Sequence, residues 1–210
     1  MQFICPTFDG QGAVGGAVTR GSHRKSARFA RCSERWTPED GVALAGTLSS
    51  FLSECARVLD VGGGTGRLAA SLAQASGCDV TVLDSDPEAV RAASGQRGVT
   101  AVVGEASALP FPDAVFDAAI IVDALHHMDE PRAAATEVVR VLRLGGALYV
   151  AEPDPRVWRV RLDLLLERLQ GEPATALRPE ALAQLFSDAG LEGECSVIPG
   201  GSCHYLGVRR

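Results

Sequence analysis

Short apolar runs alternate with stretches of helical pattern along most of this 210-residue chain. The runs end at glycine, acidic or turn residues, as buried strands do. Strands are expected over residues 58–61, 80–84, 98–103, 117–123, 147–152, 192–198 and 203–209. Because helical stretches separate all but the last two, the pattern predicts an α/β fold. The predicted fold is Rossmann-like in layout, with a doubly wound sheet of about seven mostly parallel strands that ends in a C-terminal antiparallel hairpin.

Capping residues mark the starts of several helices between these strands. Thr37 and Asp86 each precede a proline, an arrangement typical of a helix N-terminus. Gly145 and Gly146 are expected to end the helix before the fifth strand. Helices are expected over residues 37–54, 68–75, 85–94, 131–144, 154–170 and 178–190.

The strand at residues 58–61 leads directly into a glycine-rich turn that contains Gly62, Gly63, Gly64 and Gly66. A strand, a glycine turn and a helix N-terminus present unpaired backbone N–H groups to a ligand that carries a negative group. A dinucleotide-binding turn has the spacing G-x-G-x-x-G, whereas this turn reads G-x-G-x-G. The spacing therefore counts against NAD or FAD.

Two acidic residues near this turn narrow the chemistry of the ligand. Asp60 stands two residues before the first glycine, where it would repel a pyrophosphate and attract an ammonium group. Asp84 ends the second strand, where an acid can accept hydrogen bonds from both hydroxyls of a ribose. The ligand is therefore expected to be an amino acid joined to a nucleoside, as in S-adenosylmethionine.

Four segments in order resemble the class I S-adenosylmethionine-dependent methyltransferases. V-L-D-V-G-G-G-T-G and V-T-V-L-D-S-D-P are similar to the first two motifs of that family. Residues 104–117 and 122–131 resemble the adenine-binding and post-fourth-strand segments of its small-molecule branch, which includes the ubiquinone and menaquinone methyltransferases. The resemblance covers roughly residues 42–152, fits a type 11 methyltransferase domain and implies a Rossmann-like fold with S-adenosylmethionine as cofactor.

The resemblance assigns roles to individual positions. It implies that Asp60 lies near the amine of the cofactor, that Asp84 binds the ribose, and that Glu105 and the backbone of Ala106 contact adenine. Family members usually carry Asp where this chain has Glu105, a departure of one methylene. The expected cofactor-binding residues are Asp60, Gly62, Gly63, Gly64, Gly66, Asp84, Ser85, Glu105, Ala106 and Asp123.

His126 and His127 are the candidate catalytic residues, because both follow the fourth strand at the expected reaction end. A histidine titrates in the range useful for removing a proton from an acceptor. The resemblance favours His127 for a place in the cofactor pocket, and the alternative is that both rings merely cap the loop. Asp123 and Asp129 extend the pair to a weak metal cluster, but no metal site is predicted because adjacent histidines on a loop point in different directions.

Composition excludes several other classes of protein. The net charge of −6 and a pI near 5.2 argue against nucleic-acid binding. The single lysine, Lys25, has no strand or glycine loop before it, which argues against a phosphate-binding loop or a pyridoxal site. No apolar run is long enough for stable membrane insertion, and the N-terminus lacks signal-peptide features, so a cytoplasmic protein is expected. The six scattered cysteines are expected to be reduced.

The predicted organisation is a flexible segment over residues 1–22 and one domain over residues 23–210. Residues 23–54 form N-terminal helices, in which Phe29 or Trp36 belongs either to an edge helix or to a lid over the site. Residues 154–177 correspond to the substrate cap of the resembled family, or to an ordinary core-packed amphipathic helix.

The predicted function is methyl transfer from S-adenosylmethionine to a small-molecule acceptor by in-line displacement. One alternative is a non-catalytic S-adenosylmethionine-binding regulatory or partner subunit. Another is an enzyme that uses the same fold for a different transfer from a sulfonium. The sequence predicts neither the acceptor nor the oligomeric state.

Overall fold

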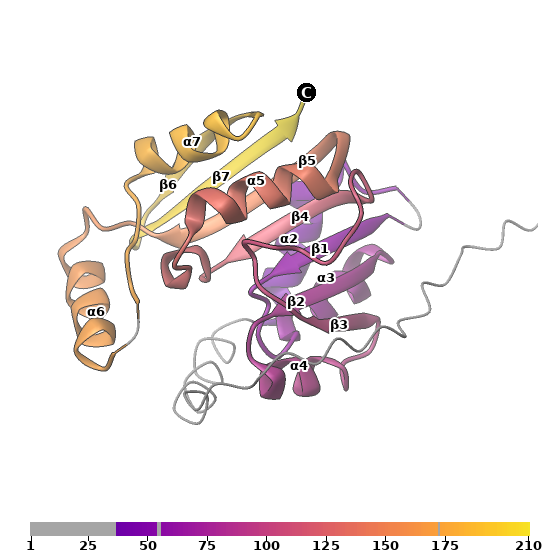
Figure 1. Cartoon of the computed structure of the whole chain (residues 1–210), viewed down its shortest axis with the longest axis horizontal. Helices are drawn as coiled ribbons and strands as arrows, with labels where there is room; N and C mark the ends of the chain where they lie inside the picture. The colour runs from indigo at the N-terminus through magenta and orange to yellow at the C-terminus, as the bar shows by residue number, and fades with distance from the viewer. Residues whose placement is uncertain (1–36, 54–55, 172) are drawn as a thin grey trace, which may run out of the picture.

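A seven-stranded sheet forms the centre of the computed structural model, which describes residues 37–53, 56–171 and 173–210 (Figure 1). The strand order is β3-β2-β1-β4-β5-β7-β6. Strands β1 to β5 pair in parallel, and β7 pairs antiparallel with both β5 and β6. The predicted fold class is therefore confirmed. The strands are β1 (Arg57–Val61), β2 (Asp79–Asp84), β3 (Val99–Val103), β4 (Phe116–Val122), β5 (Leu142–Pro153), β6 (Leu191–Ile198) and β7 (Ser202–Arg209).

Helices cover both faces of the sheet. One core cluster joins the sheet to α5 and α7, and a second joins its other face to α2 and α3. All seven residues of β4 are buried, as a central parallel strand requires. The helices are α2 (Pro38–Leu48), α3 (Arg67–Ser76), α4 (Pro87–Ala93), the short 3₁₀ helix η2 (Leu125–His127), α5 (Pro131–Val141), α6 (Trp158–Leu169) and α7 (Pro179–Asp188).

Both predicted helix caps are present. The Asp40 carboxylate accepts a hydrogen bond from the backbone N–H of Thr37 at 2.7 Å, which closes the start of α2. The Asp86 side chain accepts from the backbone N–H of Glu88 at 2.9 Å at the start of α4. These local bonds satisfy backbone groups that the first turn of a helix leaves unpaired.

Three helix boundaries differ from the prediction. Helix α2 ends at Leu48 rather than at residue 54. Helix α6 begins at Trp158 rather than at residue 154, because Asp154 is buried in a turn where it accepts hydrogen bonds from the backbone and side chain of Arg156. The third difference concerns α5.

Helix α5 ends at Val141, and β5 begins at the next residue, so the predicted helix end at Gly145 is wrong. Phe116 of β4 pairs with Leu142, but Ala118 pairs with Ala147, so β5 carries extra residues between these two pairs. Gly145, with φ of +74°, lies within this irregular stretch. Its conformation suits a bulge, which sequence alone does not distinguish from a helix end.

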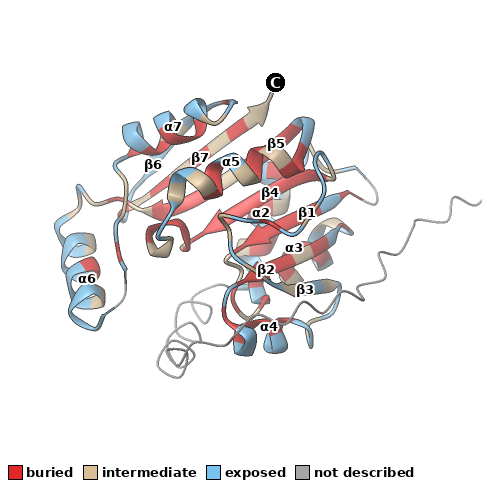
Figure 2. Cartoon of the chain, viewed as in Figure 1, coloured by how far each residue is buried: buried red, intermediate tan, exposed pale blue. Residues whose placement is uncertain are grey.

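Helix α6 stands apart from the sheet at the end where β4 and β5 finish, and most of its surface is exposed (Figure 2). Leu164 is its one buried residue. This placement agrees with a position above the sheet edge, but the prediction of a substrate cap over residues 154–177 stays a prediction. Across the residues that the structure describes, no helix combines the length and apolarity that spanning a membrane requires.

Several predictions concern residues outside the described ranges. They are the flexible segment over residues 1–22, the candidate lid with Phe29 and Trp36, and the state of Cys5, Cys32 and Cys55. The cysteines within the described ranges, Cys78, Cys195 and Cys203, are free thiols.

Candidate active site

Asp60 lies beneath the glycine turn at the carboxyl end of β1. The residue is 2% exposed, and its Oδ2 atom has no hydrogen-bond partner among the described residues. Burial, and then the charge of Asp84, raise the pKa of Asp60 to about 7. A Cβ atom on Gly63 would stand 2.5 Å from Oδ2, so only glycine lets the turn pass this close to the carboxylate. The buried acid is therefore suited to a ligand that donates hydrogen bonds or carries positive charge.

Asp84 holds the glycine turn against the end of β2. Its Oδ2 accepts a hydrogen bond from the backbone N–H of Gly64, and its Oδ1 accepts one from Asp86, each at 2.9 Å. Burial raises the pKa of Asp84 despite these two bonds. A carboxylate oxygen has more than one acceptor position, so both oxygens retain capacity for hydroxyl donors.

A cleft of about 430 Å³ lies at the carboxyl edge of the sheet, with Asp84 in its wall. That volume lies within the range of pockets that hold small molecules and cofactors. The predicted residues that line the cleft are Gly62, Asp84, Ser85, Glu105, Ala106 and His127. The remaining predicted site residues are not among the described residues that line the cleft. They are Asp60, Gly63, Gly64, Gly66, Asp123 and His126.

Arg140, which sequence reasoning missed, clamps the loop that carries Glu105 and Ala106. Its guanidinium donates to the carbonyl oxygens of Leu109 and Phe111 at 3.0 and 2.8 Å. The same group binds the carboxylates of Glu137 and Asp113. Glu137 in turn accepts from the backbone N–H of Leu109. This network fixes the cleft wall from α5, more than 20 residues away in sequence.

Glu152, also missed, organises the loop after β4 from the end of β5. Its carboxylate accepts hydrogen bonds from the backbone N–H groups of Ala124 and Leu125 at 2.9 and 2.8 Å, and from that of His126 at 3.3 Å. It also binds Nδ1 of His126 at 2.6 Å. Burial opposes a charge on His126, but the hydrogen bond and charge of Glu152 outweigh burial, and the pKa of His126 is raised.

The two candidate catalytic histidines are therefore in different environments. His126 is buried against Glu152 and does not line the cleft, whereas His127 lines it. Nδ1 of His127 lies 2.8 Å from the carbonyl oxygen of Pro173. The ring centroids of the two histidines are 4.0 Å apart, and Glu167 of α6 lies close to both. Asp123 and Asp129, the acids predicted beside them, are not in this group.

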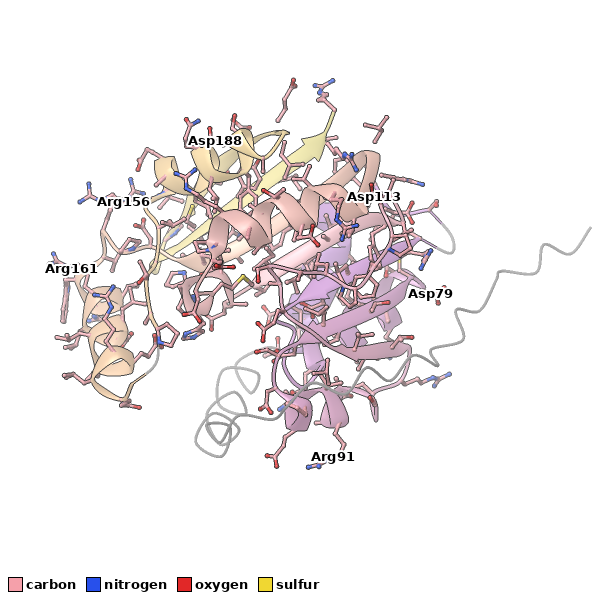
Figure 3. The ribbon with its side chains drawn as sticks, viewed as in Figure 1. Asp79, Arg91, Asp113, Arg156, Arg161 and Asp188 are labelled. Carbon is pink, nitrogen blue, oxygen red and sulfur yellow. The ribbon has the colours of Figure 1, made fainter. Side chains whose placement is uncertain are left out.

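A second pocket of about 550 Å³ adjoins the ends of β4 and β5 and lies against α6. Its charged lining groups are mainly acidic: Asp40, Asp123, Glu152, Asp163 and Glu167, together with Arg159. Asp123 has a positive φ of 53°, a conformation that is uncommon outside glycine. Arg156 and Arg161 lie at this end of the molecule, whereas Asp79 lies at the opposite end of the sheet (Figure 3).

Trp158 does not fill the second pocket, because its side chain is 67% exposed and belongs to the outer surface of α6. His204 of β7 is bound by neighbouring side chains. Both ring nitrogens of His204 are already hydrogen-bonded, to Tyr149 at 2.9 Å and to Ser202 at 3.0 Å.

Part of the chain matches a known family. Residues 59–150 match the sequence model of a family described as a methyltransferase domain. Within residues 59–150 the chain has a methyltransferase domain. Those residues run from β1, through the glycine turn and the cleft, into β5, so the methyltransferase domain holds most of the site described above.

Two curated relatives support the assignment. The chain is 34% identical over 139 residues to O-methyltransferase rstn1 of Aspergillus nomiae, a match that covers 60% of this chain and 59% of that protein. It is 41% identical over 97 residues to demethylmenaquinone methyltransferase of Renibacterium salmoninarum, which covers 46% of this chain and 40% of that protein. The chain thus spans between two fifths and three fifths of the length of these relatives.

Solved structures share the fold of this chain. A SAM-dependent methyltransferase from Thermotoga maritima superposes with a TM-score of 0.71 at 22% identity. The match covers 89% of this chain and 97% of that one. At this identity the likeness establishes the fold, and the chemistry has to be argued from the residues of the site.

The residues present fit S-adenosylmethionine, the cofactor that the family implies. The Oδ2 atom of buried Asp60 has no hydrogen-bond partner among the described residues, and an α-ammonium group would supply the donor and positive charge that suit it. Asp84 keeps acceptor capacity for ribose hydroxyls, and Glu105 with Ala106 lines the same cleft. A phosphate-bearing dinucleotide would instead bring negative charge toward two buried carboxylates.

Proposed function

We propose that this chain transfers a methyl group from S-adenosylmethionine to a small-molecule acceptor. The observation that carries the proposal is the buried Asp60, with its unpartnered oxygen beneath the glycine turn, beside Asp84 at the cleft wall. Asp60 would hold the ammonium group, Asp84 and Ser85 the ribose, and Glu105 with Ala106 the adenine. Gly62, Gly63, Gly64 and Gly66 shape the turn so that its backbone can approach the amino-acid portion.

The residues of this chain would act mainly by binding and orientation. When bound, S-adenosylmethionine supplies an activated methyl group on a sulfonium leaving group. Asp60 and Asp84 would fix the donor, and the second pocket beside Asp123 would hold the acceptor. Holding two reactants in a near-attack arrangement can account for roughly 7–11 kcal/mol of the barrier in favourable cases.

The second pocket indicates which acceptors fit best. Its acidic lining repels a free carboxylate, so acceptors without net negative charge are favoured. Helix α6 would form the outer wall of the acceptor site as a cap, since Asp163 and Glu167 contribute to this pocket. Among the catalytic candidates, His127 lies at the cleft, and His126 is a positioning residue fixed by Glu152.

Trp158 does not occupy the second pocket, which favours an enzyme over a non-catalytic binding subunit. Trp36, the other tryptophan that could fill such a pocket, lies outside the described residues. We further propose a reducing, cytoplasmic location, which the three free cysteines among the described residues support.

The proposal is tested by incubating the full chain with methyl-labelled S-adenosylmethionine and separate sets of phenols, quinols, amines and carboxylates. Label in an acceptor, matched by an equal amount of S-adenosylhomocysteine, is the expected result, with the carboxylates poorest. Binding of the donor without transfer to any set would favour the non-catalytic alternative. Release of a group other than methyl would identify a different transfer from the sulfonium.

A further inference from the structure

Three side chains meet between the cofactor cleft and the second pocket. His126 and His127 belong to η2, and Glu167 belongs to α6. One ligand atom from each, a nitrogen of either ring and a carboxylate oxygen, lies within 4.8 Å of the other two. Because His127 lines the cleft and Glu167 lines the second pocket, the cluster lies between the two spaces.

Hydrogen bonds at Nδ1 set the protonation pattern of both rings. Nδ1 of His126 donates to the Glu152 carboxylate at 2.6 Å, and Nδ1 of His127 donates to the Pro173 carbonyl at 2.8 Å. A carbonyl oxygen or an ionised carboxylate only accepts, so in each neutral ring the lone pair is on Nε2. Carboxylate and carbonyl partners of this kind orient the histidines that bind metals in proteins.

Glu167 completes the set from the opposite side. Its Oε2 atom is buried and has no hydrogen-bond partner among the described residues. A buried carboxylate oxygen without a partner is unfavourable, and a bound cation would remove that cost. Asp163, one turn earlier on the same helix, is exposed and lies outside the cluster.

We propose that His126, His127 and Glu167 bind a divalent first-row transition-metal ion. Two imidazoles and one carboxylate form a ligand set that suits such ions and leaves coordination positions open. Mg²⁺ and Ca²⁺ prefer sites built from oxygen ligands, so they are the poorer occupants. This site is unlike the cluster with Asp123 and Asp129 that the sequence suggests, because its third ligand comes from a distant helix.

The ligand atoms need to move only slightly to bind an ion. Metal–ligand bonds of about 2.0–2.2 Å bring neighbouring ligand atoms to roughly 3.0–3.5 Å of one another. The three ligand atoms all lie within 4.8 Å of one another, so they must move closer, and rotation about the side-chain bonds of Glu167 can supply part of that movement. Both histidines are held by their Nδ1 bonds, so Glu167 is the adjustable ligand.

The site suggests how the acceptor is engaged, an extension that rests on the proposed methyl transfer. The ion would lie between the cofactor cleft and the second pocket, with open positions for an oxygen or nitrogen of the acceptor. Coordination lowers the pKa of such a group and would promote loss of its proton to solvent before transfer. The acidic lining of the second pocket would also favour the cation.

Equilibrium dialysis of the full chain against Co²⁺ and Zn²⁺, after EDTA treatment, tests the site by metal analysis and by the visible spectrum of Co²⁺. We expect one ion per chain and a Co²⁺ spectrum of nitrogen and oxygen ligands. Glu167→Gln should weaken binding at least tenfold, whereas Asp163→Asn, which removes the same charge from the same helix but no ligand, should weaken it far less. His127→Asn should also weaken binding. Thermal unfolding in EDTA establishes that each variant is folded.

Three results would overturn the metal site. They are the absence of stoichiometric binding, equal affinities in the wild-type protein and Glu167→Gln, and a thiolate-to-cobalt band that assigns the ion to cysteine. S-adenosylmethionine binding in EDTA, measured on the same samples, separates the two proposals. Donor binding without metal binding would refute the metal site alone, whereas metal binding without donor binding would refute the proposed function alone.

Discussion

Nδ1 of His126 and Oε2 of Glu152 lie 2.6 Å apart, and both side chains are 3% exposed. The pair joins the loop after β4 to the end of β5, and the same carboxylate also accepts three backbone N–H groups of that loop. The position of His127 at the cleft therefore depends on a residue that does not line the cleft itself.

Replacing Glu152 with glutamine should destabilise the protein strongly. The amide removes the charge that His126 faces, and its NH₂ group cannot accept from the loop. Breaking one partner of a buried pair costs about 3–5 kcal/mol. Urea unfolding in EDTA measures the loss, with Glu194→Gln on exposed β6 as the control, expected to change stability by no more than about 0.5 kcal/mol. Equal effects of the two variants would contradict the role given to Glu152.

Binding of S-adenosylmethionine should weaken as the pH falls below about 7. Burial and the charge of Asp84 raise the pKa of Asp60 to about 7, and only the ionised form attracts the ammonium group. Affinity should fall by up to about tenfold per pH unit below that pKa. Titrations between pH 5.5 and 8 test this, with 5′-methylthioadenosine, which lacks the ammonium group, as the matched ligand.

Asp60→Asn should flatten this pH profile and weaken donor binding at pH 8. The ligand-free variant should be more stable than the wild-type protein at that pH. The raised pKa means that the folded state binds the proton of Asp60 more tightly than the unfolded state does. The contribution of Asp60 to the free energy of unfolding therefore declines as the pH rises from about 4 to 7. A steep profile retained in the variant would exclude Asp60 as its source.

Asp84→Asn should lower affinity for both S-adenosylmethionine and 5′-methylthioadenosine, because both contain the ribose. The hydrogen bonds to a charged acceptor are worth about 1.5–3 kcal/mol each, so losing one corresponds to at least about a tenfold loss. Asp79→Asn, at the other end of β2 (Figure 3), is the charge-matched control. Unchanged affinity in a folded Asp84→Asn protein would remove the ribose role.

Arg140→Met should destabilise the chain by roughly 2–3 kcal/mol, because the Oε1 atom of Glu137 and two loop carbonyls lose the guanidinium donor. Arg132→Met, also on α5, removes an exposed ion pair with Asp188 and should cost no more than about 1 kcal/mol. Chemical unfolding of the two variants makes the comparison, and equal losses would show that the clamp contributes nothing.

The sequence predicted the parts of the structure that depend on local pattern. The glycine turn, Asp84 at the end of β2 and the cap at Asp86 are each visible within a few neighbouring residues. Glu152, Arg140 and Glu167 were missed because each acts on a segment more than 20 residues away. The periodic pattern of apolar residues reflects neighbours in sequence, so it does not indicate contacts between distant segments.

The boundary between α5 and β5 illustrates the same limit. Gly145 with Gly146 reads as a helix end, yet the glycines lie within β5, where a positive φ serves a bulge. Pairing with β4 decides between these outcomes, and that pairing is set by the whole sheet.

Calorimetric titration of the full chain with S-adenosylmethionine and with NADH tests the central claim most directly. We expect S-adenosylmethionine to bind with one molecule per chain and NADH to give no binding heat. Binding of NADH in the absence of S-adenosylmethionine binding would contradict it.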